Sequence, residues 1–144
     1  MFPKLTFSTP IELINQFAKN TLVSHLGIVF TAVGEGFVEA TMPVDLKTIR
    51  PGGFLHGGAN LALAETIAGL GSMLTVDLDE FDVLGIQVSG NHTGSMTSGM
   101  VYARAEVVHF GTQTHLWNIE IRNENGKLIS TARVTNMIVK RNGK

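Results

Sequence analysis

A long segment with almost no polar character constrains the fold of this chain more than any other feature. Residues 61–74 read LALAETIAGLGSML, and Glu65 is the one charged residue among them. Apolar residues lie on nearly every side of a helix drawn through this segment, which is typical of a helix enclosed by other structure. The sequence therefore predicts one central helix buried within the fold.

Alternating β-rich runs flank that helix on both sides. Six strands are predicted, over Leu26–Val33, Phe37–Val44, Val83–Thr93, Gly99–Phe110, Thr112–Arg122 and Lys127–Lys140. At the N-terminus, Thr9-Pro10-Ile11-Glu12 predicts a capping box and a short amphipathic helix over about residues 10–19.

One apolar helix can cover only one face of a sheet, so the economical arrangement is a curved antiparallel sheet around a single helix. We therefore expect an α+β hotdog fold with about six strands, one long central helix and a short N-terminal helix. The length of 144 residues predicts a single domain spanning residues 1–144.

The composition narrows the classes of partner. Charged residues make up 16% of the chain, against about 25% in an average domain, which predicts a surface buried in a homo-oligomer. Lys and Arg total 11 against 12 Asp and Glu, so we expect neither nucleic acid nor membrane as a partner. With no cysteine and no signal-like N-terminus, a disulfide scaffold and a thiol nucleophile are excluded, and we expect a cytoplasmic location.

Glu65 is the first candidate for chemistry. A carboxylate inside an apolar helix is costly to desolvate unless it is paired or used. It either faces solvent or a strand arginine or lysine, or it serves as a catalytic nucleophile or base, because burial strengthens a carboxylate as a base.

His56-Gly57-Gly58 marks the start of the same helix. The first helical turn has N–H groups without partners and the positive end of the helix dipole, which can polarise a carbonyl. Glycine also lets a substrate approach the backbone closely. The alternative is that Gly57 and Gly58 only form a sharp turn and that His56 is an ordinary surface residue.

Spacing decides how these two candidates could cooperate. Gly57 and Glu65 are eight residues apart, which is roughly 12 Å along a helix. They cannot contact one carbonyl group from the same chain. If both act, Glu65 of one subunit must meet Gly57 of another across a two-fold axis.

Two motifs give the chain a family resemblance. Leu55-His56-Gly57-Gly58-Ala59, followed by Leu63-Ala64-Glu65-Thr66, resembles the hotdog-fold acyl-CoA thioesterases with a glutamate on the central helix. This branch includes the hydroxybenzoyl-CoA, enterobactin proofreading and dihydroxynaphthoyl-CoA thioesterases. The likeness extends to Ser24–Ile28, Met42–Asp45, Asn91-His92, His109-Phe110-Gly111 and Trp117–Ile121.

The resemblance implies a role for each matching residue. Glu65 would attack the thioester carbon or activate a water, the Gly57 amide would polarise the carbonyl, and His56 would assist. The substrate-binding residues it implies are Arg50, Gly58, Gly69, Asn91, His92, Gly111 and Thr112. It also implies a dimer or a dimer of dimers, with neither a metal nor an organic cofactor.

Thr112 stands where relatives often carry arginine or serine, and two further positions depart from the family pattern. Arg50 stands where relatives often have glutamine, and Gly69 stands where they often have serine or threonine. Because those side chains help to position the thioester or the water, a non-catalytic acyl-CoA-binding protein is the first alternative. A hydratase or dehydratase of the same fold is the second.

The expected substrate is an aromatic or medium-chain acyl-CoA. We expect its acyl pocket to be built by Phe54, Met73, Leu84 and strand residues from two subunits.

Overall fold

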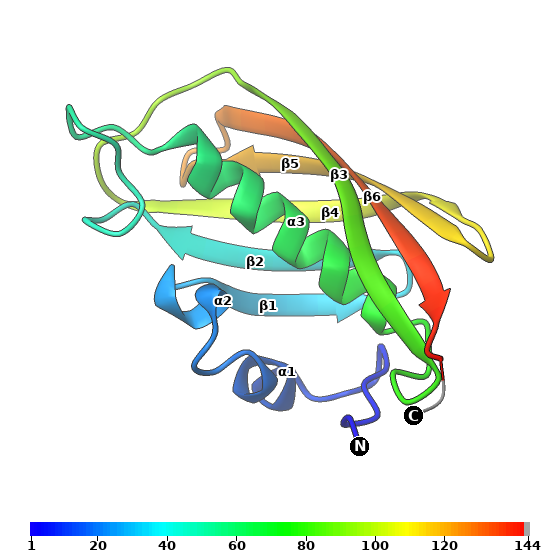
Figure 1. Ribbon diagram of the computed structural model, residues 1–144. Coiled ribbons are helices and arrows are strands. Elements are labelled where there is room, and N and C mark those ends of the chain that lie inside the picture. Colours follow the sequence, from blue (N-terminus) through cyan, green and yellow to red (C-terminus); the bar gives the residue numbers. More distant parts are fainter. Residues whose placement is uncertain (143–144) are drawn as a thin grey trace.

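The computed structural model describes residues 1–142 and shows a curved six-stranded antiparallel sheet around one long helix (Figure 1). The strand order across the sheet is β1-β2-β4-β5-β6-β3. All six predicted strands and the central helix are present, as α3 Gly57–Met73, β1 Val29–Gly34, β2 Phe37–Pro43, β3 Phe81–His92, β4 Met100–Phe110, β5 Thr114–Arg122 and β6 Leu128–Lys140.

The N-terminal region differs from its prediction in detail. Helix α1 (Ile11–Phe17) is present, but the predicted capping box is wrong because the Thr9 hydroxyl instead accepts a hydrogen bond from the Thr6 N–H. A second helix that we did not predict, α2 (Leu22–His25), has its own capping box from Thr21 and Ser24. It displaces the predicted strand start from Leu26 to Val29.

Asn15 on α1 closes one edge of the sheet. Its side-chain amide donates to the Phe30 carbonyl at 2.8 Å, and its carbonyl accepts from the Phe30 N–H at 2.9 Å. The side chain thus replaces a neighbouring strand at β1 and satisfies both polar groups of Phe30. The opposite edge of the sheet is β3, which pairs with β6 on one side only.

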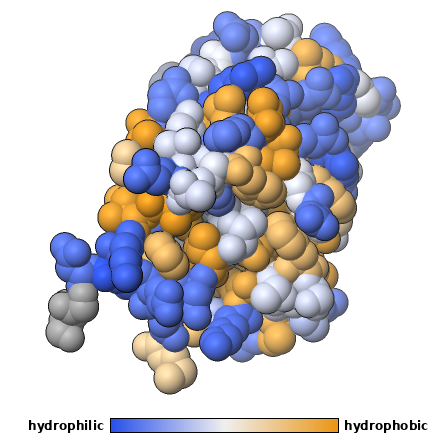
Figure 2. Space-filling view, turned by 90° about the vertical axis from the view of Figure 1, so that its right-hand side faces the viewer, coloured by the Kyte–Doolittle hydropathy of each residue, from blue (hydrophilic) through white to orange (hydrophobic). Residues whose placement is uncertain are grey.

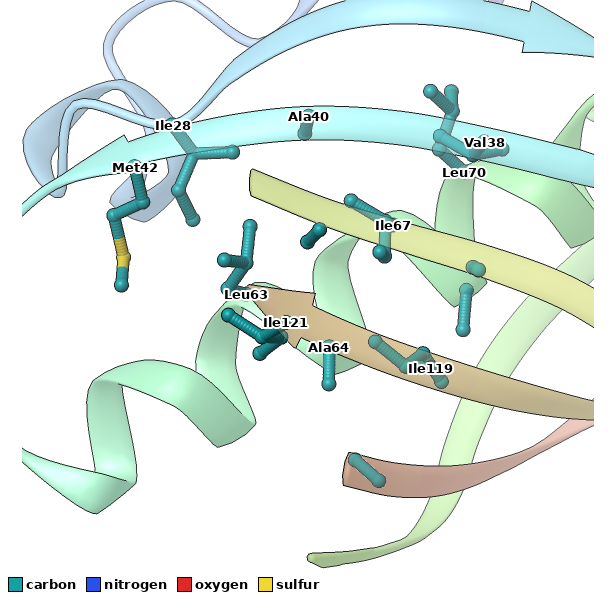
Figure 3. Close-up of a cluster of buried hydrophobic side chains, with 14 of the residues drawn as sticks. Ile28, Val38, Ala40, Met42, Leu63, Ala64, Ile67, Leu70, Ile119 and Ile121 are labelled. Carbon is teal, nitrogen blue, oxygen red and sulfur yellow. The ribbon is translucent and has the colours of Figure 1, made fainter. Parts of the chain in front are cut away.

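The hydrophobic core lies between α3 and the inner face of the sheet (Figure 3). Leu63 and Ile67 of α3 are completely buried against side chains of β2 and β5, including Val38, Met42 and Ile119. Burying a side chain of this size stabilises the fold by about 1.5–3 kcal/mol. The core therefore fixes which face of α3 turns toward the sheet.

Glu65 lies on the other face. Its side chain is exposed in the single chain and lies beside the backbone of Gly85 on β3. The prediction that α3 is enclosed on all sides is thus wrong for one chain. The reason is geometric, because one curved sheet can wrap only part of the helix surface.

Ser72 anchors the C-terminal half of α3. Its hydroxyl oxygen accepts hydrogen bonds from Trp117 Nε1–H and Asn136 Nδ2–H, each at 2.9 Å. Both partners can only donate through these nitrogens, so the Ser72 hydroxyl proton is left for His115 Nδ1 at 2.9 Å. The four side chains are buried, and their bonds require a neutral His115.

Burial lowers the pKa of His115 from its ordinary value of 6.5, a hydrogen bond to the Gly111 backbone opposes this shift, and the charge of His109 adds to it. The unfolded chain therefore binds a proton at a higher pH than the folded chain does. We expect stability that is full above about pH 6.5 and declines as the pH falls below it.

Thermal unfolding followed between about pH 5 and pH 7.5 tests this expectation. His115→Gln should give a flatter pH dependence than the parent. His25→Gln, which changes an exposed histidine on α2, should retain the parental dependence. Equal slopes for the parent and His115→Gln would contradict the assignment.

Candidate active site

The N-terminus of α3 has one amide group free for a ligand. His56 is the N-cap, and its Nδ1 accepts the Gly58 N–H at 2.8 Å. This bond places the neutral imidazole's proton on Nε2. Within residues 1–142 the Gly57 N–H has no hydrogen-bond partner. Of the two glycine amides, Gly57 is therefore the one that can polarise a carbonyl, and Gly58 is already used by the cap.

His92, at the end of β3, packs against this helix start. Its Nδ1 lies 2.9 Å from Ser130 Oγ, and Ser130 donates to the Asn91 carbonyl at 3.3 Å. The hydroxyl can then only accept from His92, so the ring is protonated on Nδ1 and Nε2 keeps its lone pair. His56 and His92 thus present opposite tautomers at one helix end.

The position of His92 explains why residue 57 is glycine. A Cβ atom at Gly57 would lie 2.5 Å from His92 Nε2, a separation that real side chains do not reach. One reason for glycine, predicted from the sequence, is that it lets a substrate approach the backbone closely. The structure adds a second reason, because the His92 ring of the same chain occupies the space that a side chain would need. Ser130, which orients the ring, is a site residue that the sequence analysis missed, because its partner is 38 residues away in the sequence.

Glu65 stands in the middle of α3 and its carboxylate makes no ion pair within the described residues. It lies beside Gly85, next to an irregularity in the β3–β6 register between Gly85 and Gln87. Such bulges often adjoin active sites, where they adjust the direction of nearby groups. The carboxylate is accordingly accessible from outside the chain.

The loop before α3 carries Arg50. Its backbone N–H donates to the Phe54 carbonyl at 2.8 Å, its guanidinium carbon lies 5.1 Å from the centre of the Phe54 ring, and its Nη1 donates to the Pro51 carbonyl at 2.9 Å. Gly69 lies one helical turn after Glu65, and a Cβ atom there would meet nothing within 4 Å.

The remaining predicted substrate-binding residues lie near opposite ends of α3. Asn91 lies beside His92 at the N-terminal end of α3, whereas Gly111 and Thr112 form the β4–β5 turn at the other end (Figure 1). Helix α3 has 17 residues and is therefore about 25 Å long. One chain thus gathers Arg50, His56, Gly57 and His92 at one end, and leaves Glu65, Gly111 and Thr112 apart from them.

Comparison with known proteins identifies the family. Residues 52–130 match the model of the thioesterase superfamily. The chain belongs to the thioesterase superfamily. This membership confirms the predicted family resemblance and the predicted hotdog fold. The protein is a thioester hydrolase.

Two named relatives cover most of the chain. Proofreading thioesterase EntH from Cronobacter sakazakii is 40% identical over 90% of this chain and 93% of its own. The 1,4-dihydroxy-2-naphthoyl-CoA hydrolase from Escherichia coli is 36% identical over 90% of this chain and 94% of its own.

A solved relative is thioesterase SAV0944 from Staphylococcus aureus. Two of its mutants superpose on this chain with TM-scores of 0.80 and 0.81 and identities of 39% and 38%, covering 82% and 83% of this chain and 98% and 99% of theirs. One has a glutamine changed to alanine and the other a glutamate changed to alanine, at positions 15 residues apart. Arg50 and Glu65 have the same separation.

The capping role of His56 and the catalytic role that the resemblance implies can be separated by substitution. His56→Ala removes the helix cap, with an expected loss of about 1 kcal/mol in stability. If His56 also donates to the substrate carbonyl, as the resemblance implies, the same change should lower kcat by about 10²–10³. His56→Asn keeps a good cap and should restore the melting temperature but not kcat. If His56→Asn restored both, the cap would be the only role of this side chain.

Proposed function

We propose that this protein hydrolyses acyl-CoA thioesters at sites shared between two subunits. The proposal rests on two groups of α3 that have no partner within residues 1–142: the Gly57 N–H at the positive end of the helix and the carboxylate of Glu65. The printed name of the Escherichia coli relative specifies a CoA thioester with an aromatic acyl group, which supports the same substrate class for this chain.

The proposed reaction uses each group in one step. The Gly57 N–H holds the thioester oxygen as negative charge develops on it. The Glu65 carboxylate either attacks the carbonyl carbon or removes a proton from the water that attacks it. In either route the C–S bond breaks and the CoA thiolate leaves. If Glu65 attacks, the acyl group is left on Glu65 as an anhydride, which water hydrolyses to release the acid and restore the carboxylate; if Glu65 acts as a base, the attacking water itself supplies the oxygen of the acid. Both routes need a carboxylate, and neither route uses a metal or an organic cofactor.

A second copy of the chain would bring these groups together. The β3 strand is 12 residues long and has no strand partner on its outer edge within residues 1–142. Leu84 and Ile86 on this strand are 48% and 51% exposed. A long free edge with apolar side chains favours pairing with another strand, so we place the two-fold contact at β3, beside Glu65.

Exposed apolar side chains support a wider contact. Figure 2 shows hydrophobic residues gathered among hydrophilic ones on the side of the molecule that carries the β4–β5 turn. Exposed hydrophobic residues of the strands near this turn and along β3 and β6 are Leu84, Ile86, Val108, Phe110 and Met137. Phe54 and Leu84, two of the predicted acyl-pocket residues, are also partly exposed in one chain. We propose that a second subunit covers these groups, and that two dimers form the tetramer that the resemblance implies.

The role of Glu65 is tested by Glu65→Gln. This change keeps the size of the side chain but removes the basic lone pair, so kcat should fall about 10³-fold or more while KM changes little. Release of free thiol from aromatic, medium-chain and long-chain acyl-CoAs measures both constants. A folded Glu65→Gln protein with parental turnover would contradict the mechanism.

Mixing two inactive variants tests the shared site. Gly57→Ala should be inactive because the methyl group displaces His92 or the carbonyl, and Glu65→Gln should be inactive as above. In a heterodimer, one site receives an intact Gly57 from one subunit and an intact Glu65 from the other. Unfolding and refolding the two together should restore about a quarter of the parental activity, since half of the dimers are mixed and each has one intact site.

Each variant refolded alone serves as the control for this mixture. No recovery on mixing, with dimers formed, would show that each site lies within one chain.

A further inference from the structure

Two groups of opposite charge near the candidate site lack an ionic partner within the described part of the chain. Arg50 contacts the Phe54 ring and donates one hydrogen bond to the Pro51 carbonyl, although a guanidinium has five N–H donors. Glu65 makes no ion pair. By contrast, Arg104, Arg122 and Arg141 each pair with a carboxylate of their own chain.

Arg50 is held close to the helix end that carries Gly57. The chain on either side of it folds back as a narrow hairpin, with Ile49 paired to Leu55 and the His56 N–H donating to the Thr48 carbonyl at 2.8 Å. In the dimer proposed above, the Gly57 end of one subunit faces Glu65 of the partner subunit. Arg50 would then come to the same contact, because the hairpin holds it beside the start of α3.

The surface of α3 beside Glu65 has room for a guanidinium. Gly69 lies four residues after Glu65, and residues four apart share one face of a helix. Apart from the neighbouring residues and backbone of α3 itself, no atom of the described residues lies within 4 Å of the place where a Gly69 Cβ atom would stand. Arginine is longer than glutamine and its planar fork can bind both oxygens of a carboxylate. The open surface at Gly69 therefore has room for the long cationic side chain of Arg50 from another subunit.

We propose that Arg50 of one subunit forms an ion pair with Glu65 of the partner subunit, over the surface left open by Gly69. Arg50 is then a positioning residue that aims the carboxylate at the carbonyl held by Gly57. The inference rests on the two-subunit site of the proposed function. It gives the two departures from the family pattern one common explanation.

Few other charges can compete for the Glu65 carboxylate. On β3, the strand beside it, residues 84–87 are Leu, Gly, Ile and Gln, which do not titrate. On α3 itself, Glu65 is the only charged residue. Other titratable groups near the proposed contact include Asp82 of β3, which already pairs with Arg141 of its own chain, and the imidazoles of His56 and His92. The guanidinium of Arg50 would therefore be the cation that meets the Glu65 carboxylate in the proposed contact.

The pH dependence of kcat/KM tests the pair in the intact enzyme. Arg50→Gln should move the midpoint of the acid limb upward by about one pH unit or more, because an opposite charge at ion-pair distance stabilises the charged form by that amount. Arg50→Lys should move it less. Arg133→Gln is the matched control, since Arg133 also lacks an ion pair but hydrogen-bonds Asn118 on β5, and its profile should stay parental.

Dimer affinity gives a second readout that does not depend on turnover. Sedimentation of Arg50→Gln, Glu65→Gln and the double variant forms a double-mutant cycle. Each single change should weaken the dimer about tenfold, and the double variant should be no weaker than either one. Effects that simply add would overturn the ion pair, even if Arg50→Gln had lost all activity.

The outcomes separate this inference from the function on which it rests. An unmoved acid limb together with a raised KM in Arg50→Gln would show that Arg50 binds an anionic group of the substrate, and would overturn the pair while leaving the thioesterase function intact. Absence of thiol release by the parent from every acyl-CoA would overturn the proposed function. A non-additive cycle would still support the ion pair in that case.

Discussion

The fixed rise of the central helix is the constraint on which the rest of this molecule depends. Among the described residues, the Gly57 N–H at the start of α3 has no partner and is free to polarise a carbonyl, and the carboxylate of Glu65 stands about 12 Å further along. No side-chain rotation closes that distance. In the proposed reaction, the open β3 edge and the exposed face of α3 leave room for a second chain to supply the missing half of the site.

A site shared between two subunits requires α3 to hold a precise position on the sheet. Leu63 and Ile67 set the rotation of the helix through burial, but apolar contacts alone tolerate small slips. The Ser72 hydroxyl, with its bonds to His115, Trp117 and Asn136, adds directional contacts that a slipped helix would leave unpaired at a cost of about 1–3 kcal/mol each. These bonds therefore favour one position of α3 along its axis, and with it one position of Glu65 beside Gly85.

Sequence reasoning recovered the six strands, the central helix and the family because each depends on local patterns or on a contiguous motif. It missed α2 because four residues are too few for a periodic signal. It predicted that α3 is enclosed on every side because an apolar helix has the same pattern whether a sheet or a second subunit covers it. Ser130 and the Ser72 cluster were beyond its reach, since strand pairing brings together residues far apart in the chain.

The free groups of the single chain can be understood together. Asn15 of α1 satisfies the β1 edge with its own amide, so the chain does close an edge where no partner is needed. Within the described residues the β3 edge has no second strand, the Gly57 N–H has no hydrogen-bond partner, and the Glu65 carboxylate and the Arg50 guanidinium have no ion pair; all four belong to the proposed contact. The proposed shared site would couple hydrolysis to assembly, because a dissociated monomer would hold only half of each site and would lose activity before it unfolds.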